Sequence, residues 1–129
     1  MKDISLYWVN ESKEDLETAE ILLDKKRFLE AAFFCHLSVE KLLKAIFAEN
    51  TEQIPPKSHN LLLLAKQANI FDTMPDATRE YIADIQPFQI EGRYPEDRER
   101  LLKNTSVETF VKILNETKEV ASWVISIIK

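Results

Sequence analysis

The chain has 129 residues, of which 45% are hydrophobic and 30% are charged. This composition is typical of a globular protein, and a chain of this length can bury most of its apolar surface without a metal or a disulfide. The formal net charge of -5 argues against non-specific binding to duplex DNA, because such binding needs a basic surface that displaces counterions. One glycine and five prolines leave little material for tight hairpins, so we expect an all-α protein with a single domain over residues 1–129.

The ends of the chain and its cysteine content indicate a compartment. The first residues, Met1–Ser5, lack a basic region followed by an apolar run, and no apolar stretch approaches the ~20 residues of a membrane span. The single cysteine, Cys35, cannot form an intrachain disulfide, and its neighbours indicate a small core residue. We therefore expect a soluble, cytoplasmic protein without membrane contact.

Charge is unevenly distributed along the chain. Residues 1–24 contain two basic and seven acidic side chains, a net charge of -5, whereas residues 25–60 contain six basic and four acidic side chains, a net charge of +2. Any anion site should therefore be sought in the second segment, and also around Arg93–Lys103.

Two long helices are predicted to form an antiparallel hairpin at the start of the chain. The first covers residues 5–26, with an apolar stripe made by Trp8 or Val9, Leu16, Ala19, Leu22 and Leu23. A short turn near Lys26–Phe28 leads to the second helix, over residues 27–49. From residue 31 to residue 48 apolar side chains fall on every side of the second helix, which predicts that it lies at the centre of the protein.

A polar stripe on this central helix is the first candidate site. His36, Glu40 and Lys44 recur at every fourth position, and Lys41 lies beside them. One interpretation is a solvated strip in which Glu40 and Lys44 form an ordinary ion pair. The other is a cleft that holds a ligand.

Shorter helices are expected in the middle of the chain. Pro55 and Pro56 interrupt the helical pattern, after which Ser58 is expected to cap a third helix that ends near Asn69. A fourth helix is expected to start at Thr73 or Asp76, with Pro75 in its first turn and with Tyr81, Ile82 and Ile85 on its apolar side.

The end of the chain is predicted to contain one long loop and one long helix. Residues 87–104 hold Gly92 and Pro95 and are interpreted as an irregular region, a kind of segment that is commonly functional. Thr105 and Glu108 have the spacing of a capping box at the start of a helix that runs to about Ile128. The sum is an antiparallel up-and-down bundle of about five helices.

Motifs of the common enzyme classes are absent from the sequence. There is no Gly-rich phosphate loop, no Cys-x-x-Cys, no His-Glu-x-x-His and no Gly-x-Ser-x-Gly. His36 and His59 are the only histidines, and two histidines on separate helices are a weak signal for a metal even with Glu40 nearby. We expect no metal and no cofactor, and His59 is more typical of a hydrogen-bonding residue at a helix start.

Several segments together resemble the HEPN domain, a helical module of higher eukaryotes and prokaryotes for which nucleotide binding has been proposed. The matching positions are Trp8, Asp15, Leu16 and Ala19, the run from Phe33 to Ala45 with Glu40, Lys41 and Lys44, then Ser58–Leu61, and finally Arg93–Pro95. The resemblance covers nearly the whole chain, and its most specific part is the combination of Glu40-Lys41-x-x-Lys44 with Ser58-His59 and Arg93-Tyr94-Pro95.

The resemblance implies a helical bundle that is often dimeric and is frequently partnered with a minimal nucleotidyltransferase in prokaryotic toxin–antitoxin pairs. Many members are RNA-cleaving toxins that use an Arg followed four to six residues later by a His. This chain departs from that pattern, because no His follows Arg79 or any later Arg, and His36 lies nine residues after Arg27. Without an imidazole beside the cation, cleavage at a 2'-hydroxyl lacks its proton-transfer group.

The remaining hypotheses are a noncatalytic module that binds a nucleotide or a nucleotidyltransferase, an atypical metal-independent ribonuclease, and a purely structural dimerisation module. In the first, Lys41, Lys44 and Arg93 hold phosphates and Tyr94 stacks on a base. In a structural interpretation, Arg93 instead pairs with Glu40 or Asp15, and Tyr94 packs on the bundle. The candidate residues are Asp15, His36, Glu40, Lys41, Lys44, His59, Arg93 and Tyr94, and the first hypothesis places Lys44 and Arg93 in one cleft.

A homodimer is also expected. The last helix carries Trp123, Val124, Ile125, Ile127 and Ile128, a wider apolar arc than one bundle face needs, and such a surplus is typical of an interface.

Overall fold

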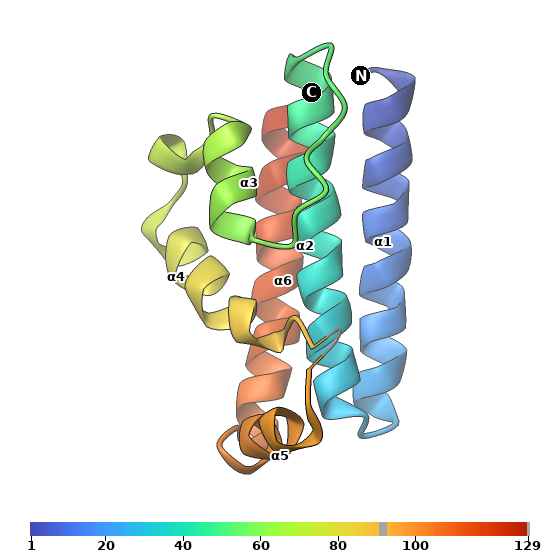
Figure 1. Ribbon diagram of the computed structural model, residues 1–129. Coiled ribbons are helices and arrows are strands. Elements are labelled where there is room, and N and C mark those ends of the chain that lie inside the picture. The colour runs from blue at the N-terminus through green and yellow to red at the C-terminus, as the bar shows by residue number, and fades with distance from the viewer. Residues whose placement is uncertain (91–92, 129) are drawn as a thin grey trace.

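A computed structural model describes residues 1–90 and 93–128. These residues form helices and loops with no strand, which confirms the all-α prediction (Figure 1). The α-helices are α1 (Asp3–Asp24), α2 (Phe28–Asn50), α3 (Leu61–Gln67), α4 (Asp76–Ile85), α5 (Pro95–Lys103) and α6 (Val107–Ile128), and two 3-10 helices lie at Phe71–Thr73 and Gln86–Phe88.

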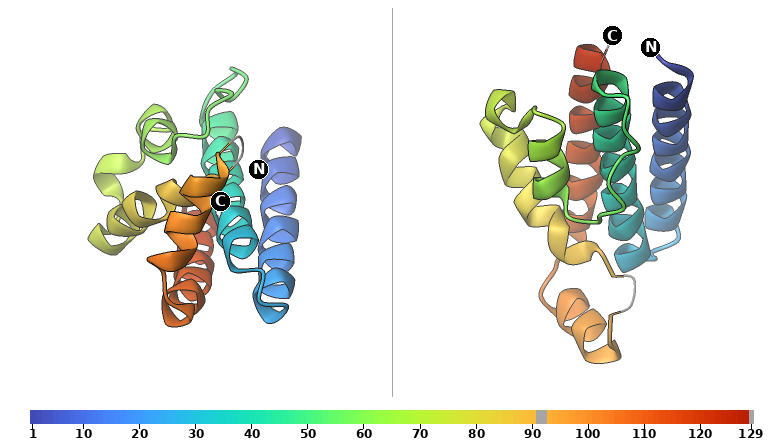
Figure 2. Two further views of the ribbon diagram at one scale, coloured as in Figure 1. Left: turned by 60° about the horizontal axis from the view of Figure 1, so that its bottom comes forward. Right: turned by 45° about the horizontal axis from the view of Figure 1, so that its top comes forward.

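Three long helices form the body of the bundle. α1 runs antiparallel to α2, while α6 lies beside α2 and runs in the same direction, so that both ends of the chain lie at one end of the bundle (Figures 1 and 2). α3 and α4 cover another side of α2 and α6, and α5 closes the opposite end. The long helices therefore do not alternate strictly up and down, because the return between α2 and α6 is made by the shorter α4.

The central position predicted for α2 is confirmed by its burial. Fifteen of its 23 residues are buried, including Glu40 and Lys44 from the polar stripe. Cys35 is buried in the core, and burial raises the pKa of its thiol to about 11, as expected for a core residue rather than a nucleophile.

Small residues bring α1 and α2 close together. Ser5, Ser12 and Ala19 are spaced seven residues apart and are all buried on the face of α1 toward the bundle. Ser12 Oγ donates to the Ser38 carbonyl at 2.9 Å, and Ser38 Oγ donates to the Ser12 carbonyl at 3.0 Å. The predicted stripe of large apolar residues missed these serines, because a search for hydrophobic periodicity does not register small polar side chains.

Two predicted helix caps are wrong by one or two residues. Asn60, rather than Ser58, caps α3, because its Oδ1 accepts the Leu63 amide hydrogen at 3.1 Å. Ser106, rather than Thr105, caps α6, since its Oγ accepts from the Thr109 amide at 3.1 Å. Ser and Asn are equally good caps, so their identity alone cannot choose between neighbouring candidates.

The region predicted to be irregular, residues 87–104, contains α5. Pro95 lies in this predicted irregular region, but it occupies the first turn of α5, where its fixed φ and missing N–H are favourable. Acidic residues follow in the first turn and basic residues lie in the last, which complements the helix dipole. Residues 91 and 92 of this region lie outside the described residues.

The apolar arc of α6 is used largely inside the bundle. Val124 and Ile128 are buried, Trp123 and Ile125 pack partly against the core, and Ile127 is 42% exposed. None of the described helices combines the length and apolar character needed to cross a membrane.

Candidate functional site

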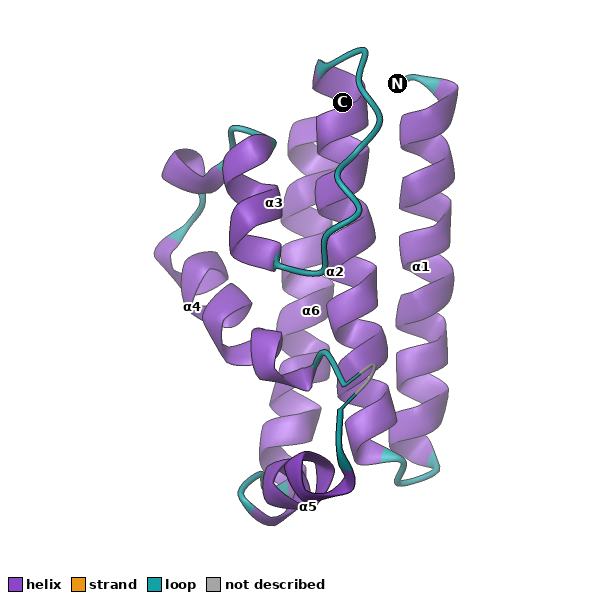
Figure 3. Cartoon of the chain, in the orientation of Figure 1, coloured by secondary structure: helices purple, strands orange, loops and turns teal. Residues whose placement is uncertain are grey.

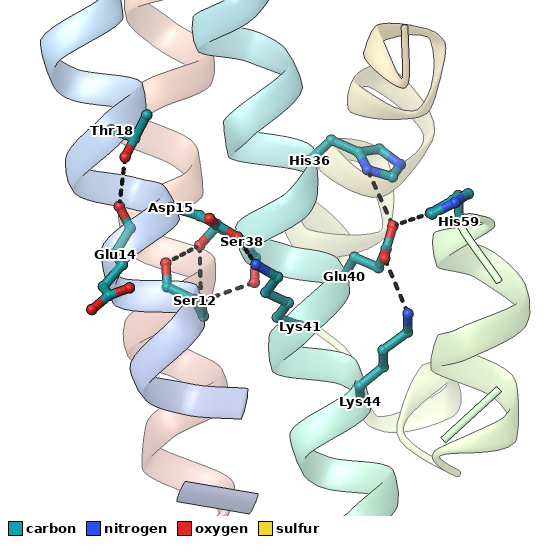
Figure 4. A network of polar contacts seen from close by, with 10 residues as sticks. All are labelled: Ser12, Glu14, Asp15, Thr18, His36, Ser38, Glu40, Lys41, Lys44 and His59. Carbon is teal, nitrogen blue, oxygen red and sulfur yellow. Dashed lines mark hydrogen bonds and ion pairs between the residues drawn. The ribbon is translucent and has the colours of Figure 1, made fainter. Parts of the chain in front are cut away.

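Glu40 is the centre of a polar cluster that we call the Glu40 cluster, made of His36, Glu40, Lys44 and His59 (Figure 4). Glu40 Oε1 lies 2.9 Å from His59 Nδ1 and 3.7 Å from His36 Nδ1. Its other oxygen, Oε2, accepts a hydrogen bond from Lys44 Nζ at 3.1 Å. Four of the eight predicted site residues therefore meet at one carboxylate.

The path of the chain after α2 explains how His59 reaches this cluster. The segment that follows α2 turns back and runs along the helix before α3 begins (Figure 3). This return brings His59 into contact with Glu40. Gln86 then fixes this position, because its side chain accepts from the Leu61 amide at 2.9 Å and donates to the His59 carbonyl at 3.1 Å. Gln86 is not among the predicted site residues, because its only signal in the sequence is a polar side chain directly after the apolar face of α4.

His36 is fully buried, with an exposed fraction of 0%. Within the described part of the chain, no hydrogen bond of standard geometry reaches either of its ring nitrogens. Burial lowers the pKa of His36, and the Glu40 carboxylate opposes this shift without cancelling it. His36 is therefore held as a neutral imidazole beside a carboxylate.

Both lysines of the stripe are paired with carboxylates. Besides its bond to Glu40, Lys44 Nζ lies 5.6 Å from the centre of the Trp8 ring, which places it between α2 and α1. Lys41 Nζ lies 2.7 Å from Asp15 Oδ2 and joins the same two helices. Burial raises the pKa of Asp15, and Lys41 opposes this shift. The stripe is thus a set of buried ion pairs rather than a solvated strip.

Arg93 and Tyr94 lie apart from the Glu40 cluster. Arg93 Nε donates to the Gln89 carbonyl at 2.9 Å. Tyr94, the residue directly before α5 in the sequence, is 71% exposed. Helix α5 is tied to the first turn of α2 by Arg98, whose Nη2 lies 2.6 Å from Glu30 Oε2. Lys44 follows Glu30 by 14 residues, or about 21 Å of helix.

The structure therefore does not bring Lys44 and Arg93 into one cleft. It also does not show the structural alternative, because the ion pairs of Glu40 and Asp15 within the described residues are made with other partners and Tyr94 is not packed on the bundle. The reason is that α5, which begins directly after Tyr94, lies against the first turn of α2 and not against its middle.

A metal site is not formed by the residues that the structure describes. No group of three or more His, Cys, Asp or Glu side chains among them is arranged to hold a metal ion.

A comparison with protein families shows the family of the chain. The HEPN domain model matches residues 5–128, so the chain belongs to the HEPN domain family. No match was found among curated proteins or among solved structures.

Proposed function

We propose that this HEPN domain is a noncatalytic binding module for a nucleotide, acting beside a minimal nucleotidyltransferase in a toxin–antitoxin type of system. One observation carries the proposal. The chain has two histidines, neither follows an arginine by four to six residues, and His36 is fully buried. A buried neutral imidazole cannot reach a ribose hydroxyl. The half-exposed His59 has no arginine four to six residues before it, so the paired Arg and His of the RNA-cleaving members are absent from the sequence.

The Glu40 cluster supports a binding role at the start of α3. The His59 side chain is 52% exposed while the Glu40 carboxylate behind it is almost fully buried. A ligand phosphate that contacts His59 or Lys44 competes with the Glu40 carboxylate for contact with the same side chain. We therefore expect a dissociation constant in the micromolar range or weaker, with an affinity that falls as salt is added.

Arg93 and Tyr94 form a second candidate contact, next to α5 and near the start of α2. An exposed guanidinium next to an exposed aromatic ring suits a phosphate and a stacked base of a single strand. In this proposal the residues at the middle and near the start of α2 contact different parts of a longer ligand, so Arg93→Ala weakens binding of an oligonucleotide more than binding of a mononucleotide.

The proposal is tested by incubating the purified protein with RNA and, separately, by titrating it with adenosine monophosphate. We expect intact RNA and a measurable binding heat. RNA cleavage by the parent protein that is lost in an Arg93→Ala variant prepared in the same way contradicts the noncatalytic reading. The proposed partner is tested by purifying the protein from native extract and identifying co-purified proteins by mass spectrometry. A co-purified nucleotidyltransferase supports the proposed partner.

A further inference from the structure

A pocket of about 490 Å³ opens between α3 and α4, next to the Glu40 cluster. Its volume lies within the usual range for pockets that hold small ligands. The apolar part of its lining comes from Leu62, Phe71, Ile82 and Ala83, and the polar part comes from Asn60, Arg79 and Gln86. Asn60 directly follows His59, so the pocket and the Glu40 cluster meet at the start of α3.

One wall of the pocket is held rigidly by Arg79. Its guanidinium donates to the carbonyls of Phe71 and Asp72, at 3.0 and 2.8 Å, and to Asp76 Oδ1 at 3.1 Å. The same group lies 5.3 Å from the centre of the Phe71 ring. Since Arg79 is already paired with a carboxylate, it offers a flat surface rather than a free charge, and its fixed position removes an ordering cost from binding.

Two amides of the pocket retain hydrogen-bonding capacity. Gln86 uses one lone pair of its oxygen and one of its two N–H groups to hold the start of α3. Asn60 spends its oxygen on the α3 cap, and none of the hydrogen bonds among the described residues uses its NH₂ group. The pocket therefore combines donors and an acceptor in fixed positions with an apolar, aromatic lining.

We infer that this pocket binds a planar heteroaromatic ring that carries a hydrogen-bond acceptor and a donor side by side on its edge, the class to which nucleobases belong. The apolar lining, which includes the Phe71 ring, suits the faces of such a ring, and the amides of Asn60 and Gln86 suit its edge. The inference deepens the proposed function and rests on it. The base can belong to a free nucleotide or to an unpaired position of RNA.

Adenosine is the probe for this pocket, because it has a base and no phosphate. We expect the parent protein to bind adenosine measurably and ribose 5-phosphate more weakly, in titrations followed by NMR amide shifts. Ala83→Phe fills the pocket from an exposed position and is expected to weaken adenosine binding at least tenfold. Ala77→Phe is the matched control, since Ala77 is exposed on the same helix but lies outside this pocket.

Asn60→Asp tests the hydrogen bonds separately from the fold. Asp is as good a helix cap as Asn, so the melting temperature is expected to stay the same while the NH₂ donors disappear. Adenosine affinity should fall about three- to tenfold, the effect of one hydrogen bond. A tetraadenylate that binds more tightly than adenosine monophosphate identifies RNA as the source of the base, and equal binding identifies the free nucleotide.

The inference and the proposed function fail in different ways. Adenosine binding that is equal in Ala83→Phe and Ala77→Phe overturns the pocket but leaves nucleotide binding in place. A second outcome is that ribose 5-phosphate binds as tightly as adenosine monophosphate while adenosine does not bind. This outcome overturns recognition of the base but leaves phosphate binding in place. If adenosine, adenosine monophosphate and the oligonucleotide all fail to bind, both the pocket and the nucleotide-binding function are wrong.

Discussion

His59 Nδ1 lies 2.9 Å from Glu40 Oε1, and this contact joins the residue two places before α3 to the middle of α2. Lys44 holds the other oxygen of the same carboxylate at 3.1 Å. Glu40 thus has a structural role, because it anchors the segment between α2 and α3. It also places a negative charge next to the half-exposed imidazole of His59. The binding proposal depends on this arrangement at the start of α3.

Removing the charge of Glu40 should destabilise the fold. Glu40→Gln leaves the Lys44 ammonium buried without a counter-charge, so we expect the free energy of unfolding to fall by about 3 kcal/mol. Lys44→Met in the same background should recover part of this loss, since the two residues form one pair. Urea denaturation of the parent, of Glu40→Gln, of Lys44→Met and of the double variant completes a double-mutant cycle. Additive losses in the double variant contradict a coupled pair.

The stability of the protein should depend on His36 at mildly acidic pH. The pKa of His36 is lowered in the folded state by burial, so between that value and the unfolded value of about 6.5 the unfolded chain binds more protons. The free energy of unfolding should therefore fall as the pH drops below about 6.5 and stay level above it. The expected slope is at most about 1.4 kcal/mol per pH unit.

This pH effect is best measured where His36 is the only histidine that titrates. His59 and Glu40 face His36 across the cluster, so the comparison uses His59→Gln with and without His36→Gln, between pH 5.5 and pH 7.5. The slope should be present in the first protein and reduced in the second. Equal slopes in the two proteins would show that His36 is not the titrating group.

Cys35 should be unreactive in the folded protein. Its thiol is buried and its pKa is raised to about 11 by burial, so the reactive thiolate is scarce at pH 8. We expect a chromogenic disulfide reagent to label the native protein only at the rate of unfolding, and to label it at once in 6 M guanidinium. Rapid native labelling, at the rate of a free thiol, contradicts this placement of Cys35.

A homodimer remains a prediction, now with a smaller expected interface on α6. Ile127, Val111 and Val107 are exposed on that helix, whereas Val124 and Ile128 are buried within the bundle. Light scattering at micromolar concentration should give a mass near twice the 15.0 kDa of one chain. Ile127→Lys is then expected to shift the protein toward monomer, while a parent protein that is monomeric throughout contradicts the prediction.

The fold was largely predictable because helical periodicity is a local signal. The centrality of α2 followed from apolar residues on all its sides, and the end of α3 was marked by Asn69, which adopts a left-handed φ of 60°. The position of α5 was not predicted, because a proline such as Pro95 breaks a helix when it lies in the interior but is favoured when it lies in the first turn.

The site was only partly predictable because its members come from different elements. The stripe of His36, Glu40 and Lys44 follows from helix spacing, and the structure brings these side chains together. The approach of His59 and Gln86 depends on how the chain returns after α2, which no local pattern encodes. The separation of Arg93 from Lys44 has the same cause, since the place where α5 packs on α2 is set by a tertiary contact, that of Arg98 with Glu30.

The most direct test of the central claim is a calorimetric titration of the purified protein with adenosine monophosphate at two salt concentrations. Lys44→Ala and Arg93→Ala are titrated in parallel, with thermal melts on each. The account predicts micromolar or weaker binding that falls with salt and weakens in folded Lys44→Ala. Arg93 is exposed and bonded to a carbonyl, so Arg93→Ala should keep the parent melting temperature. No binding heat in the parent at either salt concentration would contradict a nucleotide-binding module.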